Sequence, residues 1–519
     1  MKLSKSVMFG AAACLLSTSA SAQAAGDLLA LSQYNYSFST ARSAALGGAF
    51  TSLGADLSSM SINPAGLGMY MSSDFGISPS LTWNNMQSTY LGTKSDYSRT
   101  RFTLGNLGMA FNLYQGSGTL TSFTLGVGYT KLADFNTTSA AYGQGIDKSI
   151  TDVLAEYMNG VPLSSLGHPD NDPYQPFRHA DIGLWGGILA YQTGILDPMS
   201  NVQDNTQYTV ANNLATSSRI NPSMRNVNKG SVDEYSISGG FNIQNILYLG
   251  FTIGIQDILY RNDNYYSETY DNNPLPLNGM NYIRSLHLDG TGVNFKFGAV
   301  VRPVENLRIG VAVHTPTLVS INEEYIEWMS ADYKNTARGE LLDSPRSLNE
   351  YDINTPTRLL TGISYTLPGV GLITADYERV WYNRMKLRNM GTENWDFQQT
   401  INNEVSSFYQ PANNFRVGIE ATPAQNFYIR AGYANYGECI ATRDAFNNMS
   451  SINSYENYSA GLGFRFQNMY VDLAYIYTEY KYAPYTMFYY GDPDYVVNPG
   501  NVETKQSRNT ITMSVGVRF

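Results

Sequence analysis

Cysteine is almost absent from this chain, and basic residues are outnumbered. The 519 residues include two cysteines, Cys14 and Cys439, and 33 Lys and Arg against 43 Asp and Glu, for a formal net charge of -10. Loss of an N-terminal leader would leave Cys439 alone, so no intramolecular disulfide can form. Nucleic-acid binding needs a surplus of cations for the phosphates, and the acidic balance therefore argues against nucleic acid as a partner.

Long apolar runs and catalytic motifs are also lacking. After residue 22 no segment reaches the roughly 18 uninterrupted apolar residues that a membrane-spanning helix needs. A membrane location would therefore require a closed β-barrel, because only helices and closed barrels satisfy every backbone group in lipid. The sequence contains no nucleophile elbow, zinc-ligand spacing or phosphate loop, and its four histidines do not cluster. We expect no enzymatic activity and no bound metal or cofactor.

The first 22 residues have the pattern of a secretory signal peptide. A basic segment, 1–5, precedes an apolar stretch over 7–16, and Ala20-Ser21-Ala22 places small residues at cleavage spacing. The alternative is a lipid attached to Cys14, but Ala11-Ala12-Ala13 lacks the branched residue expected before a lipidated cysteine. We therefore expect a chain that is exported and then cleaved after residue 22.

What the chain does contain is alternation of apolar and polar residues in segments of about ten, separated by turns. Over 414–421, for example, Phe415, Val417 and Ile419 alternate with charged residues or glycine. The 40 Tyr and 46 Gly suit twisted strands with aromatic girdles, although a β-sandwich or propeller would look similar by composition alone. The pattern predicts fourteen strands, at 74–83, 102–114, 122–135, 234–243, 247–259, 291–302, 307–314, 358–367, 371–381, 414–421, 427–433, 457–466, 469–477 and 511–519.

The connections between these strands are alternately short and long. All the long ones fall on the side opposite to the short turns and both termini: 84–101, 136–233, 260–290, 315–357, 382–413, 437–456 and 482–509. Outer-membrane barrels have this asymmetry, with short periplasmic turns and long extracellular loops. We therefore predict an all-β protein whose residues 71–519 form a fourteen-stranded antiparallel transmembrane barrel in the bacterial outer membrane. One short helix is expected in the largest loop, where Ile150 to Met158 have helical spacing.

The polar face of each strand is expected to line the lumen. Charges of both signs occur there, and the arginines among them are candidate ligand residues: Arg308, Arg416, Arg430 and Arg465. Two interpretations are open. These arginines could form ion pairs that hold the wall to a plug, since buried charges need partners, or one or two of them could bind a ligand carboxylate. An apolar entry groove could form from loop aromatics such as Tyr265, Tyr266, Tyr489 and Tyr490.

Residues 23–70 precede the first strand, and within them 41–69 are too rich in Gly and small residues to form a strand or a stable helix throughout. Pro64 removes a backbone donor and restricts Asn63 to extended or turn geometry, and the Asn63 amide can satisfy nearby backbone groups. Such a turn can hold a compact plug, although an ordinary N-terminal turn would use the same residues. The segment contains Ala44-Ala45-Leu46-Gly47-Gly48-Ala49, Gly54-Ala55-Asp56 and Ser61-Ile62-Asn63-Pro64-Ala65-Gly66-Leu67.

This arrangement resembles the N-terminal hatch of the long-chain fatty acid transporter (FadL) family, in which a Gly-Gly-Ala turn, an Ala-Asp step and an Asn-Pro-Ala-Gly-Leu motif precede strand one. The resemblance covers nearly the whole mature chain, because that family also has fourteen strands, short periplasmic turns and a terminal aromatic residue, here Phe519. It implies a hatch that blocks the lumen and gates it, formed around Gly47, Gly48, Asp56, Asn63, Pro64, Ala65 and Gly66.

The resemblance also implies a route for a ligand. Extracellular loops would capture a hydrophobic molecule such as a long-chain fatty acid, and a kinked third strand would release it sideways into the bilayer. By position that strand is 122–135, where Gly126 and Gly128 would permit a bend. The 136–233 loop does not match the family's usual loop lengths, so the resemblance does not place the capture site.

The partners expected are the lipid bilayer, a fatty-acid-like ligand and the barrel-assembly machinery, which would recognise the C-terminal strand that ends in Phe519. We expect a monomer. The alternative function is that of a barrel of the same fold that serves as a scaffold or shuttle partner in protein secretion. A general diffusion porin for polar solutes is disfavoured, because a plug of about forty residues should leave no open aqueous pore.

Overall fold

The computed structural model describes residues 26–166, 172–178, 180–334, 340–391, 394–441, 451–492 and 495–519. The predicted signal peptide and Cys14 lie outside the described residues. Within these ranges no helix is long and apolar enough to cross a membrane.

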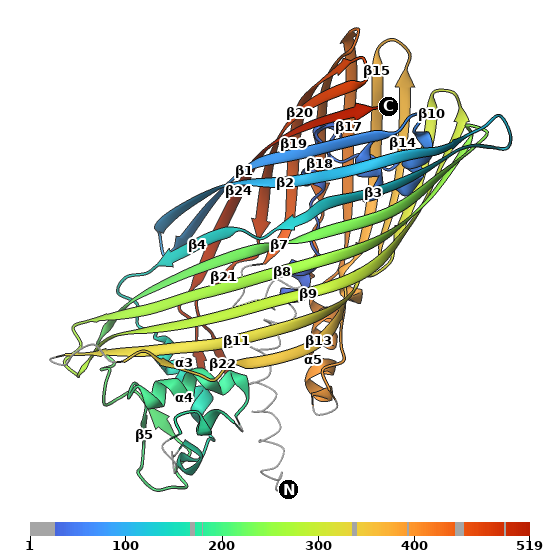
Figure 1. The fold of residues 1–519 in the computed structure, drawn as a ribbon. Helices are drawn as coiled ribbons and strands as arrows, with labels where there is room; N and C mark the ends of the chain where they lie inside the picture. Colours follow the sequence, from blue (N-terminus) through green and yellow to red (C-terminus); the bar gives the residue numbers. More distant parts are fainter. Residues whose placement is uncertain are drawn as a thin grey trace, which may run out of the picture.

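Fourteen antiparallel strands form one barrel (Figure 1). The last strand pairs with the first, Val517 opposite Phe75, and this pairing closes the cylinder. The predicted number and order of strands are confirmed. In chain order the strands are β1 (Asp74–Tyr90), β2 (Thr93–Gln115), β3 (Leu120–Asp134) with β4 (Thr137–Tyr142), β7 (Arg219–Ile243), β8 (Leu247–Asp271), β9 (Leu277–Val304), β10 (Leu307–His314) with β11 (Leu318–Tyr333), β13 (Ser347–Asn354) with β14 (Arg358–Leu367), β15 (Gly371–Trp381) with β16 (Lys386–Arg388), β17 (Pro411–Ala424), β18 (Phe427–Tyr436), β19 (Ile452–Phe466), β20 (Met469–Tyr482) with β21 (Tyr485–Thr486), and β24 (Asn501–Arg518).

Alternation along each strand separates an outer surface from the lumen. Near the short turns many of the side chains that point inward are polar, small or glycine, whereas those that point outward are large, apolar and exposed. A surface of this kind matches lipid rather than water. We call it the apolar belt, and it includes Phe75, Ile77, Phe102, Tyr235, Ile237, Phe251, Ile253, Phe295, Phe297, Val417, Ile419 and Leu473.

Several strands extend much farther than the sequence pattern indicates. β9 has 28 residues, and 291–302 is only part of it. The prediction of long loops at 84–101 and 260–290 is wrong, because β1 and β2 meet at a tight turn and β8 continues to Asp271 before β9 begins. Much of 315–357 and of 482–509 is strand as well. Beyond the apolar belt the outward side chains include exposed Lys229, Arg261 and Asp289, so the apolar alternation that marks a lipid-facing strand is lost there.

Two proline-containing segments interrupt neighbouring strands at the same level of the barrel. Thr315-Pro316-Thr317 separates β10 from β11, and Thr355-Pro356-Thr357 separates β14 from β13. Proline has no N–H to give to a β-ladder. The two segments still bind each other, because the Thr355 N–H donates to the Thr317 carbonyl at 3.1 Å and the Thr317 N–H donates to Thr355 Oγ1 at 2.8 Å. The wall therefore stays continuous here.

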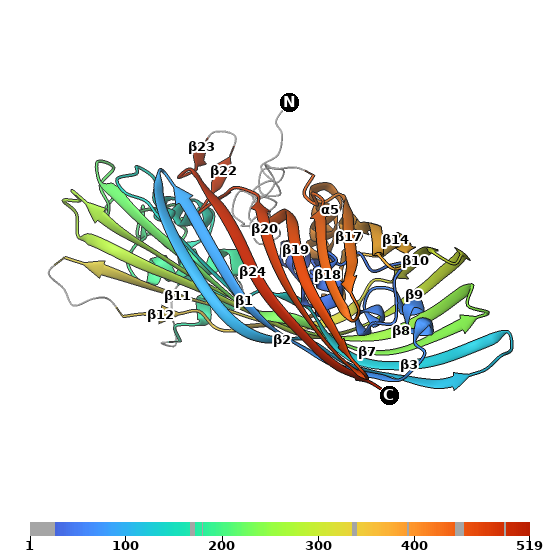
Figure 2. The same cartoon turned by 90° about the horizontal axis from the view of Figure 1, so that it is seen from above.

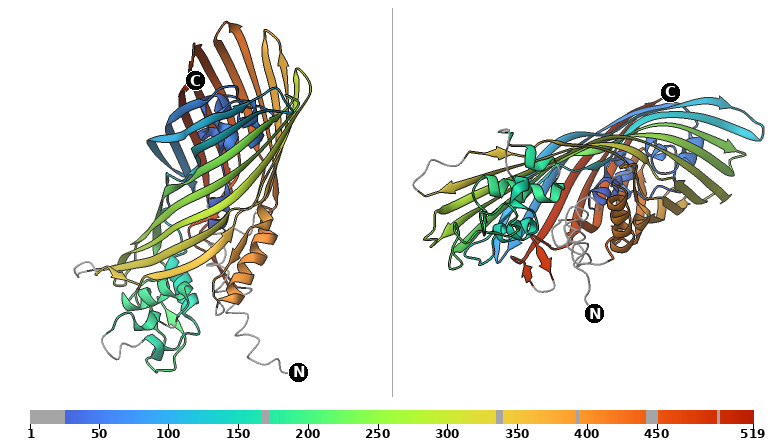
Figure 3. Two further views of the ribbon diagram at one scale, coloured as in Figure 1. Left: turned by 45° about the vertical axis from the view of Figure 1, so that its right-hand side comes forward. Right: turned by 90° about the horizontal axis from the view of Figure 1, so that it is seen from below.

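The helices outside the lumen gather at the end of the barrel opposite to the C-terminus and the short turns (Figures 1 and 3). We call this the loop end. The predicted helix at 150–158 is confirmed as α3 (Ile150–Met158), which begins at a capping box formed by Ser149 and Asp152. A second helix in the same loop, α4 (Trp185–Gln192), was not expected, because its residues are apolar all round and show no helical stripe. A third, α5 (Trp395–Phe408), lies between β16 and β17.

Short elements complete the loop end. They are η4 (Leu163–Leu166), η5 (Gln175–Phe177), η6 (Ile182–Leu184), β5 (Asp197–Pro198), β6 (Tyr208–Thr209), β12 (Leu342–Asp343), η7 (Tyr382–Arg384), β22 (Tyr490–Asp492) and β23 (Tyr495–Val497).

The N-terminal segment lies inside the barrel as a plug, toward the end with the short turns (Figures 2 and 3, blue). It contains η1 (Tyr36–Phe38), α2 (Ala41–Ala45), η2 (Leu57–Met60) and η3 (Pro64–Met69). Almost every plug side chain between Ser39 and Gly68 is buried against the wall. The wall accommodates this contact with glycine, since a Cβ added at Gly298 would lie 1.8 Å from Asn63 Oδ1 and one at Gly250 would lie 2.2 Å from the Pro64 carbonyl carbon.

Candidate functional site

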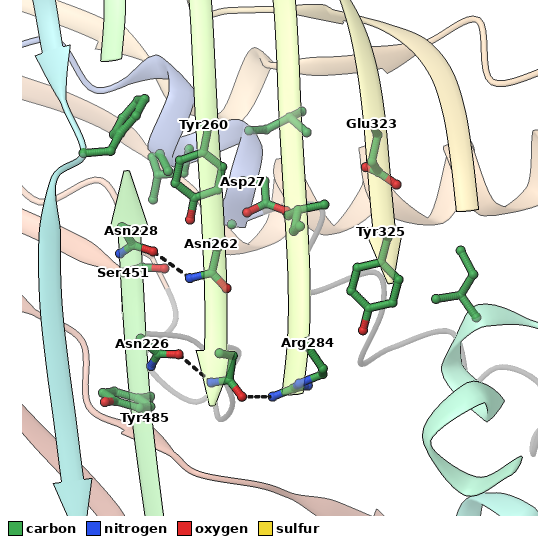
Figure 4. Close-up of a pocket in the computed structure, with 18 of the residues that line it drawn as sticks. Asp27, Asn226, Asn228, Tyr260, Asn262, Arg284, Glu323, Tyr325, Ser451 and Tyr485 are labelled. Carbon is green, nitrogen blue, oxygen red and sulfur yellow. Dashed lines mark hydrogen bonds between the residues drawn. The ribbon is translucent and has the colours of Figure 1, made fainter. Parts of the chain in front are cut away.

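A cavity of about 970 Å³ lies at the loop end of the lumen, above the plug. Its walls come from the outer halves of β7, β8, β9 and β11, from α3, and from the first described residues of the plug, 26–35. Figure 4 shows part of it. Aromatic side chains cover much of the lining, and they include Phe135, Tyr260, Tyr282, Tyr325, Tyr351, Tyr455, Tyr480 and Tyr485. Tyrosine offers an apolar ring face with a polar tip, so these walls can hold an apolar group and hydrogen-bond a polar one.

Asparagines on neighbouring strands form a polar band across one wall of the cavity (Figure 4). The Asn262 side chain on β8 donates to Asn228 Oδ1 on β7 at 2.6 Å. One step closer to the loop end, Asn264 donates to Asn226, and Arg284 of β9 donates from Nη2 to Asn264 Oδ1 at 3.2 Å. The Arg284 guanidinium also lies 5.3 Å from the centre of the Tyr282 ring. A ligand with a polar group would therefore find both donors and acceptors on this wall.

Acidic side chains occupy another part of the lining. Asp27, from the plug, and Glu323, from β11, both line the cavity (Figure 4). Burial, together with the neighbouring Glu323 carboxylate, raises the pKa of Asp27 well above its usual range. Glu327 accepts a hydrogen bond of 2.5 Å from the Tyr325 hydroxyl. The cavity thus combines aromatic faces with both cationic and acidic groups.

The plug forms the floor of the cavity. The Tyr34 hydroxyl donates to Gln256 Oε1 of β8 at 2.9 Å, and the Tyr455 hydroxyl of β19 donates to the Tyr34 carbonyl at 2.7 Å. On the third strand, the Leu132 carbonyl accepts a 2.8 Å bond from the Asn35 N–H. These contacts tie the start of the plug to three parts of the wall, directly below the cavity.

The wall beside the cavity loses its β-ladder between the second and third strands. β2 pairs with β3 from Asn106 opposite Thr130 to the short turn, but toward the loop end the third strand pairs, among the described strands, with β7 only. The ladder of β1 with β2 continues through this interval. We call the interval the window; it comprises 98–105 of β2 and 131–139 of the third strand. Phe102 of the apolar belt, 74% exposed, lies on β2 within it.

The third strand leans toward the lumen at the window. Phe135 lines the cavity and packs edge-on against Tyr260, with 5.2 Å between ring centres. The Asp134 carbonyl accepts a 3.0 Å bond from Nη2 of Arg508 on β24, and the Asn136 carbonyl accepts a 3.1 Å bond from the Asn84 side chain on β1. Both donors belong to strands on the far side of β2, so this part of the third strand lies on the lumen side of its neighbours.

The hatch residues predicted from sequence lie together in the plug, where they shape its turns. Gly47 and Gly48 have positive φ angles, 66° and 74°, which favour glycine. Asp56 caps η2 by accepting from the Ser58 N–H, and it also accepts a 2.7 Å bond from the Thr40 hydroxyl. Asn63 caps η3, with Pro64, Ala65 and Gly66 in its first turn, and donates to the Thr51 carbonyl at 2.6 Å.

Gly126 and Gly128 lie in the regular part of the third strand, below the window. Their pairing with β2 and β7 is unbroken. A Cβ at Gly126 would lie 2.8 Å from the Met60 sulfur, and one at Gly128 would lie 2.6 Å from Met60 Cε. These glycines therefore leave room for the plug, and the third strand departs from β2 after Thr130.

Three of the four predicted lumen arginines are held in ion pairs. Arg416 lies 3.0 Å from Glu378, and Arg430 contacts Glu420 at 2.5 Å and Asp472 at 2.6 Å. Arg465 shares Asp472, at 3.1 Å. The plug joins this network, because Arg42 lies 3.3 Å from Glu420. Arg308 is half-buried near a short turn, and none of the four lines the cavity.

The arginines that do line the cavity, Arg284 and Arg508, were missed by the sequence reasoning. Both lie in segments that were predicted to be loops, 260–290 and 482–509, and so were not assigned to an inward face. Alternation over 502–518, where Gln506 and Arg508 are buried, carries the signal that would have placed Arg508 in the lumen. Of the predicted groove aromatics, Tyr489 lines the cavity, and Tyr266 packs against Phe488 of the lining at 5.9 Å.

The sequence matches no protein-family model and no curated protein. The fold, in contrast, is similar to solved structures. A Pseudomonas aeruginosa FadL homologue has a TM-score of 0.53 and 11% identity, over 94% of this chain and 98% of that chain. The P. putida toluene transporter TodX has a TM-score of 0.50 and 12% identity, over 94% of this chain and 99% of that chain. A deltaS2 mutant of TodX, a monoaromatic hydrocarbon channel, has a TM-score of 0.52, 12% identity and coverage of 94% and 100%.

The closed barrel of fourteen antiparallel strands, with its apolar belt and internal plug, defines a β-barrel of the bacterial outer membrane. More particularly, its fold is that of the FadL-type channels. The fold class, the resemblance and the location predicted from sequence are therefore confirmed.

Proposed function

We propose that this protein takes up hydrophobic small molecules across the outer membrane, without an enzymatic step. The observation that supports this most directly is the aromatic-lined cavity of about 970 Å³, which lies between the loop end and a plug and borders a window in the wall. A cavity of this size suits a small organic ligand. The plug, formed by 26–70, closes the path toward the end with the short turns, so the window is the exit that remains.

The proposed exit is sideways. The window lies at the level of Phe102, at the outer edge of the apolar belt, so a ligand that passes through it would enter the outer leaflet. The irregular part of the third strand, 131–139, therefore replaces Gly126 and Gly128 as the proposed site of opening. Partition from the cavity to the bilayer would drive the transfer, because burial of apolar surface in lipid is favourable.

The lining supports a ligand that is apolar with a polar group, and long-chain fatty acids are the candidates that we propose. TodX is a toluene transporter, and the tyrosine faces of this cavity would accept an aromatic ring too. The asparagine band and Arg284 would bind a polar head group, since an unpaired polar group in the cavity would be costly. An unbranched hydrocarbon without a polar group would form no hydrogen bonds with the asparagine band or Arg284.

We also propose an oligomeric state and an assembly signal for the whole protein. We propose that it acts as a monomer, since the barrel closes on itself within one chain. The C-terminal strand ends in Phe519, which is 63% exposed, and we propose this end as the segment that the barrel-assembly machinery recognises.

The test combines ligand identification with a block at the window. Native mass spectrometry of protein purified from outer membranes would detect a bound fatty acid. Uptake of radiolabelled oleate would then be measured in cells whose own fatty acid channel is deleted. Ala133→Trp, which fills the cavity side of the window, is expected to lower uptake severalfold. Ala180→Trp, in the cavity lining but away from the third strand, is the matched control.

Two outcomes would contradict the proposal. Equal oleate and toluene uptake in cells with and without the protein would exclude transport of these probes. Purified protein that carries a partner protein but no small ligand would favour the alternative, a scaffold in protein secretion.

A further inference from the structure

The outer half of the third strand is held away from β2 by groups on two other strands. Arg508 of β24 is 4% exposed and donates from Nη2 to the Asp134 carbonyl at 3.0 Å and from Nε to Asn84 Oδ1 at 2.8 Å. Asn84 in turn donates to the Asn136 carbonyl at 3.1 Å. Arg508 and Asn84 together therefore bind both ends of the segment 134–136.

The partners of Arg508 are unusual among the buried arginines of the lumen. Arg358, Arg416 and Arg430 all form ion pairs with carboxylates. Arg508 forms none with the described residues; its partners are a carbonyl, an amide and the rings of Phe38 and Tyr480, at 5.4 and 5.3 Å. A buried guanidinium needs hydrogen-bond acceptors, and the Asp134 carbonyl is one of the acceptors of Arg508. The same hydrogen bond holds the third strand on the lumen side.

Opposite this segment, β2 has an edge without a β-ladder. Half of the N–H and C=O groups of a strand point to each edge, and an unpaired edge readily accepts another strand. Residues 98–105 of β2 pair with β1 on one side, and no described strand pairs with them on the other. The outer half of the third strand, which pairs with β7 alone, is the neighbouring segment that could fill this edge.

The two borders of the window are already close to alignment. Below it, Asn106 is opposite Thr130, and continuing this register one residue at a time places Ser95 opposite Ala141. The Ser95 hydroxyl contacts the carbonyl of the adjacent Ala140, and the Tyr97 and Tyr142 hydroxyls are hydrogen-bonded at 3.0 Å. These side-chain contacts hold the two strands next to each other at the outer border of the window, although no β-ladder joins them there. The unpaired backbone of β2 and of the third strand therefore already lies side by side at both borders.

We propose that the third strand has two positions and that Arg508 is the positioning residue that selects between them. With 134–136 bound to Arg508 and Asn84, the strand lies on the lumen side and the window is open. When this contact is lost, the same segment pairs with 98–105 of β2 and the window closes. This inference rests on the proposed sideways route for its consequence in transport, but the two positions of the strand can be tested without transport.

The test is hydrogen exchange of the β2 amides in the full-length protein, in detergent micelles. In the wild type, the amides of 98–105 that face the window lack a partner and should exchange quickly. Arg508→Met should slow their exchange by about tenfold or more, because they gain partners from the third strand. Lys505→Met, an outward-facing change on the same strand β24, should leave these amides unchanged. A merely structural role for Arg508 would speed exchange rather than slow it.

Asn84→Ala provides a second variant if Arg508→Met fails to fold, and it should slow the same amides to a smaller degree. In cells, Arg508→Met should lower oleate uptake severalfold while native mass spectrometry still detects oleate bound to the purified variant. Unchanged or faster exchange over 98–105 in folded Arg508→Met protein would overturn the proposal. Slower exchange of these amides together with normal oleate uptake would support the two positions of the strand and would contradict the sideways route.

Discussion

At the scale of single residues, Asn63 shows how one side chain can organise the plug. Its oxygen accepts from the Ala65 N–H at 3.1 Å and caps η3, while its nitrogen donates to the Thr51 carbonyl at 2.6 Å. Loss of a cap costs about 1 kcal/mol, and loss of a buried hydrogen bond costs about as much again. We therefore predict that Asn63→Ala speeds amide exchange over 57–69 by tenfold or more, since 1.4 kcal/mol corresponds to about tenfold.

Asn63→Ser is the matched control for that experiment. Serine retains a side-chain oxygen that can cap η3 but has no amide donor for Thr51, so its exchange should fall between wild type and Asn63→Ala. Equal exchange in all three proteins would contradict the role given to this side chain.

Cys439 is a second residue for which a property can be predicted, namely the reactivity of its thiol. It lies in the connection between β18 and β19, is 1% exposed, and accepts a 3.4 Å bond from the Gln33 amide. Burial raises the pKa of its thiol to about 12, so the reactive thiolate is scarce at neutral pH. We predict that a maleimide leaves Cys439 unlabelled in the native protein and modifies it after denaturation. Rapid labelling of the native protein would show that this loop opens.

From the sequence alone, the plug residues could be predicted more readily than the residues that line the cavity. The plug residues could be identified because Asn63-Pro64 and Gly47-Gly48 carry local backbone rules that do not depend on the rest of the fold. The cavity arginines could not, because Arg284 and Arg508 become neighbours of one cavity only when strands distant in sequence are assembled. Arg416 and Arg430 lie on the predicted inward face, yet their pairing with Glu378 and Asp472 depends on strand register.

At the scale of elements, α5 offers a pH-dependent test. Burial raises the pKa of the Glu404 carboxyl from its usual value to about 7. The folded helix therefore favours the protonated acid, so the stability of α5 is greatest below pH 4.5 and falls as the pH rises toward 7. We predict lower exchange protection of 395–408 at pH 8 than at pH 5, after correction for the intrinsic exchange rate. Glu404→Gln should remove this difference, and a difference that persists would assign it to another group.

Strand length is where the sequence pattern was least informative at this scale. Inside the apolar belt the outward residues must be apolar, so alternation located all fourteen strands. Beyond the belt both faces of β7, β8 and β9 admit polar residues, such as Lys229 outside and Asn228 inside, and the alternation that reveals a strand is lost. The hydrogen bonds that extend these strands are made by the backbone, which leaves no trace in the side-chain pattern.

At the scale of the whole molecule, the plug leads to a prediction about ion current through the barrel. Plug residues between Ser39 and Gly68 are buried against the wall, and Asp376 of β15 binds the Phe50 and Thr51 N–H groups at 2.8 Å each. We predict that the wild-type protein gives no steady ohmic current in planar bilayers, and that deletion of 41–69 gives one. Asp376→Asn, which weakens the anchor without removing the plug, should give brief openings. A large steady current through the wild type would contradict the plugged lumen.

The length of β9 has a consequence for where a ligand first meets the protein. At roughly 3.3 Å per residue its 28 residues span about 90 Å along the strand, whereas the apolar band of an outer-membrane barrel is about 25 Å tall. Even on a tilted strand, part of the excess therefore extends past the apolar belt at the loop end, where β7, β8 and β9 carry exposed charged side chains. Under the proposed function, a hydrophobic molecule would first meet the protein at this polar rim, at a distance from the bilayer.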